Sequence, residues 1–355
     1  MIVEKHQSRL NFSRAMFLNS HSLSLLSKYG LHKTMRNNGR LIGGVCIVGG
    51  ISNDAPLCIC DLSPYIHGDL HPISIPQNAV ERVLEEHLNG LGVFVSRPVV
   101  YKDHRLHSEH IISTVQDSSG DIISIKSRYL LGADGFHSSV RKRLGLVMDG
   151  ETLSGARFVA ADVTLPAYPF AADICVWISE KGAMIAIRMG ETAVRLAATN
   201  EALREHMLSL CSPSPPPAPP PQVDWMADFD IHHFHTREHG RGHVQLAGDA
   251  VHVHSPIGGR GMNMGIADAL ALGEAVAAGG CFEEYHRTRQ KETMNWVSSN
   301  KTLSLFACSQ HFTFRWIRWI AVGMLRVIGK IWGGDKIALM AFELISGVPL
   351  PRPRD

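Results

Sequence analysis

The segment best suited to hold a ligand is a strand followed by a glycine-rich loop and a helix. The apolar run 243–247 predicts the strand, and the Gly-Asp pair at 248–249 follows it directly. A carboxylate at a strand end can accept hydrogen bonds from sugar-like hydroxyls. Pro256 and several glycines then lead into a small-residue helix, which we predict over 261–278. Glycines let the backbone approach a planar ligand, and the free N–H groups of a helix start favour negative charge.

A second segment, residues 129–141, repeats this order of elements. The apolar run at its start predicts a buried strand that ends in Gly-Ala-Asp-Gly, which includes Asp134. Ser138 or Ser139 is suited to cap a short helix that carries Arg141. An Asp-Gly pair is often only a turn, so this segment alone is weak evidence for a ligand site. Its occurrence together with the similar segment at 243–263 strengthens that interpretation.

Polar residues also stand at the ends of two further predicted elements. Residues 77–90 carry apolar side chains at helical spacing, and Gln77 opens that helix. A polar side chain at this position often only caps a helix, so this alternative stays open. The apolar start of the chain reads as the end of a strand that carries Glu4, and Arg14 precedes a helix predicted over 20–29.

Together these segments resemble the group A FAD-dependent monooxygenases, the family of para-hydroxybenzoate hydroxylase and of the aromatic and polyketide hydroxylases. Residues 248–263 are similar to its motif Gly-Asp-Ala-(Ala)-His, Pro, Gly-x-Gly-x-Asn, and residues 132–141 to its Gly-Ala-Asp-Gly-x-x-Ser-x-Val-Arg motif. The resemblance implies FAD, NAD(P)H as co-substrate, and oxygenation of an aromatic or polyketide-like small molecule. It assigns no catalytic side chain, and the cofactor-binding residues that it implies are Glu4, Arg14, Gln77, Asp134, Gly248, Asp249, Pro256, Gly259, Gly261, Met262 and Asn263.

The resemblance is incomplete at the start of the chain. A dinucleotide-binding fold opens with a strand, a Gly-x-Gly-x-x-Gly turn and a helix, and residues 1–5 look like the strand that follows these elements. Residues 45–51 imitate such a turn but lack its third glycine, so we interpret them as a hairpin. We therefore expect the chain as written to bind FAD poorly. Glu4 and Asp249 can hold the sugars, but the diphosphate between them would lack its helix start.

These motifs predict an α/β chain of interwoven parts. An incomplete doubly wound FAD-binding fold is expected to alternate with a substrate domain, whose short strands between Pro and Gly turns indicate an antiparallel sheet. A helical region follows. The predicted FAD-binding domain comprises 1–36, 77–150 and 241–282, the substrate domain comprises 37–76 and 151–240, and the helical region is 283–355.

Two stretches stand apart in composition. Residues 213–221 hold seven prolines in nine positions and predict an extended surface loop, which serves better as a spacer than as a recognition ligand. Residues 312–330 are apolar but interrupted by four cations, too many for a spanning helix. Packing against the domains and lying at a membrane interface with Trp and Arg anchors are the two alternatives.

Composition favours a soluble enzyme. The 355 residues are 45% hydrophobic and 19% charged, and the formal charge of +2 argues against a nucleic-acid binder. Seven cysteines without framework spacing favour reduced thiols and a cytoplasmic location. The histidines at 232–239 lack a completing ligand set, so we expect no metal site. The oligomeric state stays open.

Two alternatives to a hydroxylase remain. Related flavoprotein folds serve as halogenases, epoxidases or prenyl reductases, and the halogenases are disfavoured because their Trp-x-Trp-x-Ile-Pro signature is absent from the sequence. The second alternative is a truncated, weakly active or non-catalytic remnant of the family, which the missing phosphate loop would favour.

Overall fold

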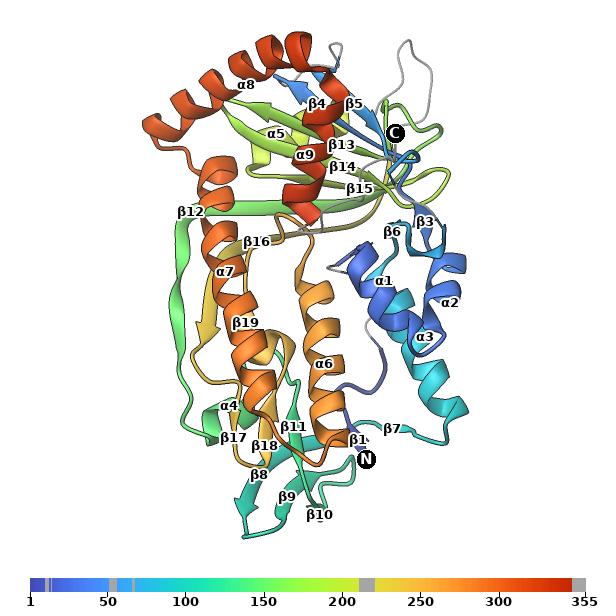
Figure 1. The fold of residues 1–355 in the computed structure, drawn as a ribbon, viewed down its shortest axis with the longest axis vertical. Helices are drawn as coiled ribbons and strands as arrows, with labels where there is room; N and C mark the ends of the chain where they lie inside the picture. The colour runs from blue at the N-terminus through green and yellow to red at the C-terminus, as the bar shows by residue number, and fades with distance from the viewer. Residues whose placement is uncertain (10–12, 14, 51–55, 66–67, 211–220, 347–355) are drawn as a thin grey trace.

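The structure, a computed structural model, describes residues 1–355 except 10–12, 14, 51–55, 66–67, 211–220 and 347–355. It has a β-rich upper part and a lower part of helices and small sheets (Figure 1). Two long strands, β12 (Met148–Thr164) and β16 (Gln222–Thr236), run between these parts, as does the helix α7 (Glu283–Cys308). The α/β class predicted from the sequence is confirmed.

The upper part is built on an eight-stranded sheet in the order β19-β16-β12-β15-β14-β13-β4-β5. All neighbours pair antiparallel except β4 and β13, which pair parallel from Val45 opposite Ile174 onward. The sheet is therefore mixed, not purely antiparallel as predicted, whereas the predicted hairpin at 45–51 is confirmed by the antiparallel pair β4 and β5. The remaining strands are β4 (Gly44–Gly49), β5 (Cys58–Asp61), β13 (Ile174–Ser179), β14 (Gly182–Arg188), β15 (Ala193–Ala198) and β19 (His252–Val253).

Four small sheets complete the strand pairing. The strands β1 and β7 pair parallel in one of these sheets, and β11 and β18 pair parallel in another, so the parallel pairing expected of a doubly wound fold is divided between two sheets. The strands β8, β9 and β10 form an antiparallel meander. Their bounds are β1 (Ile2–Val3), β2 (Phe17–Leu18), β3 (Arg40–Leu41), β6 (Ile73–Ser74), β7 (Val95–Ser96), β8 (Val100–Leu106), β9 (Ile111–Gln116), β10 (Ile122–Ser127), β11 (Leu130–Gly132), β17 (Gly240–Arg241) and β18 (Val244–Leu246).

The helices begin and end close to the predicted positions. Gly30, at a left-handed φ of 71°, separates the first two, and Ser138 caps the short helix that carries Arg141 by accepting from its N–H. The helices are α1 (Ser20–Ser27), α2 (Leu31–Asn37), α3 (Gln77–Gly90), α4 (Ser139–Arg143), α5 (Glu201–Leu210), α6 (Gly261–Ala277), α8 (Phe312–Trp332) and α9 (Gly334–Ser346), with 3-10 turns η1 (Gly68–Leu70) and η2 (Gly248–Ala250).

Hydrophobic clusters cover both faces of the large sheet. On one face α5 buries Leu203 and Met207 against Trp177, and on the other α9 buries Leu339 and Phe342 against β4 and β5. The helical character predicted for 283–355 is confirmed over α7, α8 and α9. The predicted polyproline loop at 213–221 lies, except for Pro221, outside the described residues.

Candidate cofactor and substrate site

The two principal sequence motifs lie side by side because their strands pair. Leu130–Gly132 runs parallel to Val244–Leu246, with Gly132 opposite Leu246, and the Ala247 N–H donates to the Gly132 carbonyl at 3.0 Å. Both strands therefore deliver their Gly-Asp turns to one edge of the small sheet. Asp249 is exposed at this edge, at the carboxyl end of β18.

Two glycines allow α6 to approach the turn η2 closely. A side chain at Gly248 would lie 3.9 Å from the Gly265 Cα, and Gly248 itself has a left-handed φ of 61°. The Gly248 N–H donates to the Asp268 carboxylate at 2.9 Å. This contact fixes η2, and with it Asp249, against the first turns of the helix.

The loop before α6 owes its conformation to two other glycines. Gly258 has φ 97° and Gly259 φ 59°, so both need the left-handed region, and the Gly259 N–H closes a turn on the Pro256 carbonyl at 2.9 Å. Gly261 has no positive φ. An added Cβ there would lie 3.9 Å from the His254 ring, an ordinary contact distance, so neither the backbone nor the space at this position demands glycine.

Asn263 holds this loop in place with its side chain. It is buried, and its amide donates to the carbonyls of Phe17 and Gly259, both at 2.9 Å. Its carbonyl oxygen accepts from the Asn19 N–H at 3.0 Å. The side chain predicted to face a cofactor is thus occupied by the protein, and the backbone of the first helical turn is the part that can serve a ligand.

The start of α6 is suited to an anion or a carbonyl oxygen. Arg260 at the N-cap makes no capping hydrogen bond through its side chain, and the first turn contains no acidic residue. The N–H groups of that turn therefore keep the positive end of the helix dipole uncompensated by a side chain.

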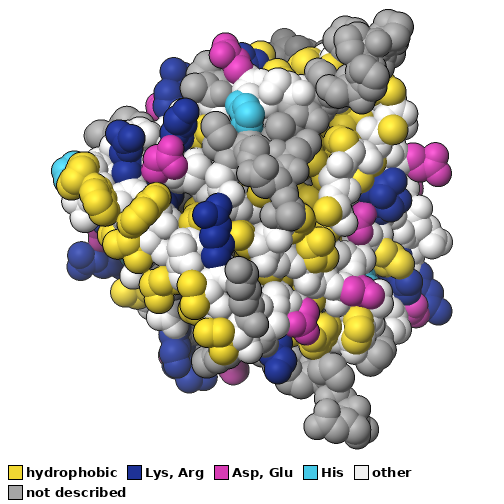
Figure 2. All heavy atoms as spheres, turned by 90° about the horizontal axis from the view of Figure 1, so that it is seen from above, with side chains coloured by type: hydrophobic (Ala, Val, Ile, Leu, Met, Phe, Trp, Pro, Cys, Tyr) yellow, Lys and Arg dark blue, Asp and Glu magenta, His cyan; other side chains and the backbone are white. Residues whose placement is uncertain are grey.

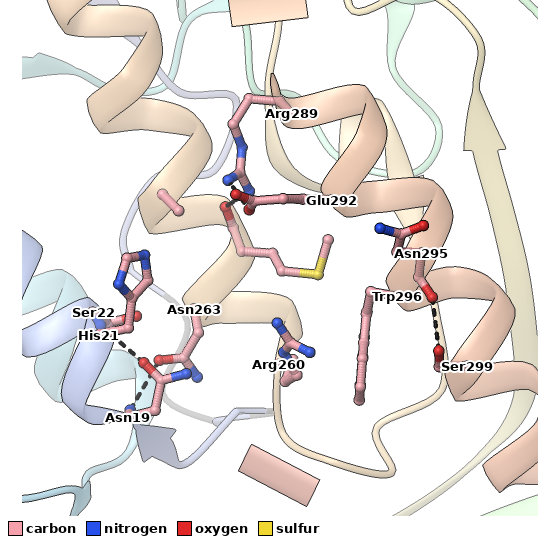
Figure 3. Close-up of a pocket in the computed structure, with 12 residues that line it drawn as sticks. Asn19, His21, Ser22, Arg260, Asn263, Arg289, Glu292, Asn295, Trp296 and Ser299 are labelled. Atoms are coloured by element: carbon pink, nitrogen blue, oxygen red, sulfur yellow. Dashed lines mark hydrogen bonds and ion pairs between the residues drawn. The ribbon is translucent and has the colours of Figure 1, made fainter. Parts of the chain in front are cut away.

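A polar cavity opens between α1, α6 and α7 beside this helix start (Figure 3). Its volume is about 410 Å³, within the roughly 300–1,000 Å³ typical of small-molecule pockets. The Arg260 guanidinium lies over the Trp296 ring, 4.0 Å from its centroid, and makes no ion pair with any residue that the structure describes. The other lining residues are Asn19, His21, Ser22, Asn263, Met264, Ala267, Arg289, Glu292, Asn295 and Ser299.

A buried charge network ties the site together. Asp268 is fully buried and accepts from the Arg289 guanidinium at 2.6 Å, and its other oxygen lies 2.7 Å from His252 Nε2. Burial alone would raise the pKa of Asp268, but the His252 hydrogen bond and the Arg289 charge outweigh burial and lower it to about 2. The network joins η2, β19, α6 and α7, and sequence reasoning did not find Arg289.

Histidines near the loop are buried in the scaffold. His252 Nε2 lies 2.7 Å from the Asp268 carboxylate, and His254 Nδ1 lies 2.9 Å from the Ser255 carbonyl. Burial lowers the pKa of His254 to about 3, so this ring is neutral at physiological pH. Within the described ranges no group of three His, Cys, Asp or Glu side chains is placed to hold a metal ion.

The other predicted residues make contacts within the protein. Asp134 caps α4, accepting from Ser138 Oγ and from the Ser139 N–H at 2.6 Å. Gln77 Oε1 accepts from the Ala15 N–H at 3.3 Å. Glu4 is half-buried at the end of β1 and accepts from the His6 N–H at 2.9 Å. Arg14 lies outside the described residues.

Arg141 is a residue whose role the sequence did not show. It is buried, and its guanidinium donates to the Ala250 carbonyl at 2.9 Å and to the Phe136 carbonyl at 2.7 Å. It therefore binds the second motif to the turn η2 of the first. The paired motifs are one structural unit.

Comparison with known proteins decides what this unit is. Residues 1–280 match the family described as FAD binding domain. The chain belongs to this FAD-binding family. The match covers both motifs, the loop before α6 and the whole of that helix, so FAD is the cofactor that the family implies.

Two curated relatives of this FAD-binding chain are monooxygenases by name. An uncharacterized aromatic compound monooxygenase of Bacillus subtilis (strain 168) is 28% identical over 291 residues, covering 78% of this chain and 56% of that protein. The rifampicin monooxygenase of Rhodococcus hoagii is 28% identical over 295 residues, covering 78% of this chain and 58% of that protein. The chain thus spans somewhat over half the length of these relatives.

Solved structures share the fold of this FAD-binding chain. The p-nitrophenol 4-monooxygenase of Pseudomonas putida DLL-E4 superposes with a TM-score of 0.80 at 21% identity, covering 97% of this chain and 91% of that one. A flavin-dependent monooxygenase solved with FAD and substrate gives a TM-score of 0.76 at 17% identity, covering 97% of this chain and 68% of that one.

The residues present fit the flavin half of FAD. An exposed carboxylate stands at the strand end, the turn and the helix lie close together at Gly248 and Gly265, and the first turn of α6 contains no acidic residue. These are the features that sugar hydroxyls and a polar ring edge require.

Proposed function

We propose that this protein is an FAD-dependent monooxygenase that uses NAD(P)H and O2 to hydroxylate or epoxidise an aromatic or polyketide-like small molecule. The observation that carries the proposal is the convergence of the two paired motifs and the glycine loop at the start of α6, within a match to the FAD-binding family. The names of the relatives support oxygenation as the reaction.

Each site residue has a proposed part in holding the cofactor. Asp249 would accept from the ribityl hydroxyls, and Glu4 from the ribose of the adenosine. The segment from Pro256 through Gly259, Gly261, Met262 and Asn263 would flank the ring, and the N–H groups of α6 would stabilise negative charge at the pyrimidine edge. Arg14, Gln77, Asp134 and Gly248 would complete the surroundings by resemblance.

FAD, when bound, supplies the redox chemistry between NAD(P)H, O2 and the substrate. The chain's own contribution is positioning and electrostatics. The glycine loop fixes where the ring can lie, and the large sheet above α6 is suited to cover a substrate and exclude water (Figure 1). Polar groups in the cavity beside Arg260 would orient a polar substrate or cofactor group.

The described cysteines are consistent with a cytoplasmic location, which we also propose. None of them forms a disulfide, and all but Cys281 are buried. Among the described helices none is long and apolar enough to cross a membrane.

The decisive experiment measures cofactor and oxygen use together. Purified protein is titrated with FAD by flavin fluorescence, then supplied with NADH or NADPH and a panel including p-nitrophenol and rifampicin, the compounds that relatives' names indicate. We expect weak but saturable FAD binding, substrate-stimulated NAD(P)H oxidation at high FAD concentration, and one labelled oxygen atom in the product under isotopically labelled O2. Product without NAD(P)H oxidation would contradict the proposed oxygenation; one relative at 25% identity, from Streptomyces rugosporus, is named a dialkyldecalin synthase.

A further inference from the structure

The outer face of α8 carries a continuous stripe of exposed apolar side chains. Trp319 is 62% exposed and Ile331 is 70% exposed, values unusual for large apolar residues in a packed helix. Figure 2 shows hydrophobic side chains gathered along this helix, with basic side chains beside them. The stripe comprises Phe312, Trp316, Ile317, Trp319, Ile320, Met324, Val327 and Ile331.

The rotation of α8 is fixed, so the stripe is held outward. On the opposite face Arg318 is fully buried and donates to the carbonyls of Ser179 at 2.9 Å, Glu180 at 2.8 Å and Phe306 at 2.6 Å. Val322, one turn further on, is buried. At about 100° per residue, the eight exposed side chains fall within a sector of about 160°. The side of α8 that faces the protein is therefore anchored by a charged side chain, whereas the side that faces solvent is apolar.

The charges of α8 are of one sign. Residues 312–332 contain Arg315, Arg318, Arg326 and Lys330 and no acidic residue. Arg315 and Arg326 are exposed and lie on one flank of the stripe. Exposed cations on long stems beside two Trp rings are the anchors expected at the boundary between lipid headgroups and acyl chains.

We propose that α8 binds the surface of an anionic lipid bilayer, lying parallel to it with the apolar stripe inserted. A helix of 21 residues would lie along about 31 Å of membrane. Its apolar side chains would enter the outer acyl region while Arg315 and Arg326 meet lipid phosphates and carboxylates. The inference does not depend on the chemistry proposed for the flavin site.

A bilayer suits this face better than a second copy of the chain. In a symmetric pair of α8 helices the exposed arginines would approach each other, and the helix itself offers no carboxylate to compensate them. Anionic headgroups provide that compensation along the whole flank. Charge complementarity therefore favours the membrane.

The test compares binding to vesicles of phosphatidylcholine alone with binding to vesicles that also contain phosphatidylserine, by co-flotation of the purified full chain. We expect clear preference for the anionic vesicles, which falls as salt is raised. Trp316→Ser with Trp319→Ser should weaken binding by at least about tenfold, because each ring loses apolar burial. Arg326→Glu should weaken binding by at least about fivefold, since one cation near the surface is worth about that factor.

Matched controls lie elsewhere on the surface. Phe94→Ser removes an aromatic ring that is 66% exposed, and Arg105→Glu reverses an exposed cation on β8. Both should leave binding unchanged, and all variants should keep the thermal unfolding midpoint of the parent. Brominated lipid should quench tryptophan fluorescence in the parent more than in the Trp316→Ser, Trp319→Ser variant.

Three results would overturn the proposal. Binding to anionic vesicles could be absent, or the stripe and control variants could bind equally. The third is a dimer by light scattering that Trp319→Ser dissociates while vesicle binding is missing, which would assign the stripe to a second copy of the chain.

Discussion

Acid should destabilise this protein through two buried histidines near the site. His233 and His239 are 2% and 1% exposed, and neither ring nitrogen of either has a hydrogen-bond partner. Burial lowers the pKa of each from its ordinary value of 6.5 to about 4. In the unfolded chain these two histidines therefore become protonated below about pH 6.5, whereas in the folded chain they become protonated only near pH 4.

The sign and size follow from this difference. Stability is fully present above pH 6.5 and is lost as pH falls toward 4, because protons favour the unfolded state throughout that window. At about pH 5 each histidine costs about 2 kcal/mol, so the pair removes about 4 kcal/mol from a total that is commonly 5–15 kcal/mol. A loss of this size is easily measured.

Urea unfolding followed by tryptophan fluorescence from neutral pH to about pH 5 measures the loss. His239→Phe should be less acid-sensitive than the parent by about 2 kcal/mol across this window, because one titrating ring is gone. His137→Gln, which removes an exposed histidine outside the core, should leave the pH dependence unchanged. An identical acid slope in the parent and in His239→Phe would refute the reasoning.

Three further predictions concern the site. Asp249→Ala should weaken FAD binding by about tenfold to a hundredfold, since a hydrogen bond to a charged group is worth about 1.5–3 kcal/mol, and an unchanged dissociation constant in a fluorescence titration would remove the assigned role. Gly259→Val should lower flavin occupancy while far-UV circular dichroism stays near that of the parent, because φ 59° strains a branched residue; full occupancy would show that the loop is not at the flavin. Asp268→Asn should cost about 3–5 kcal/mol of unfolding free energy by leaving Arg289 buried without its carboxylate, and a loss below about 1 kcal/mol in urea unfolding would contradict the network.

Local patterns predicted the elements around the site well. The helix expected over 261–278 is Gly261–Ala277, and the helix opened by Gln77 runs to Gly90 as expected. Periodicity and terminal residues act within one turn, so the sequence carries this information locally. The hairpin at 45–51 was predicted for the same reason.

Long-range pairing was not predictable from those patterns. No local sequence pattern indicates that β4 pairs parallel to β13. The sheet that we expected to be antiparallel is mixed for this reason. The ion pair of Asp268 with Arg289 joins two different helices, and the contact of Asn263 with Asn19 spans most of the chain. Such partners are chosen by tertiary packing, which a single sequence does not display.

These unpredicted contacts explain how a glycine-rich loop can be a defined site. Gly258 and Gly259 give the loop a backbone that few other residues could adopt, but glycine also makes the unbound loop costly to order. The Asn263 side chain offsets this cost by fastening Gly259 and the chain at Phe17 to α6, and Asp268 fastens η2 to the same helix. The ordering cost is thereby met during folding, not during ligand binding, which leaves more of the contact free energy for affinity. Asn263 and Asp268 belong to the helix whose first N–H groups are proposed to meet the flavin ring. A change that loosens α6 should therefore weaken FAD binding even when no ligand contact is altered.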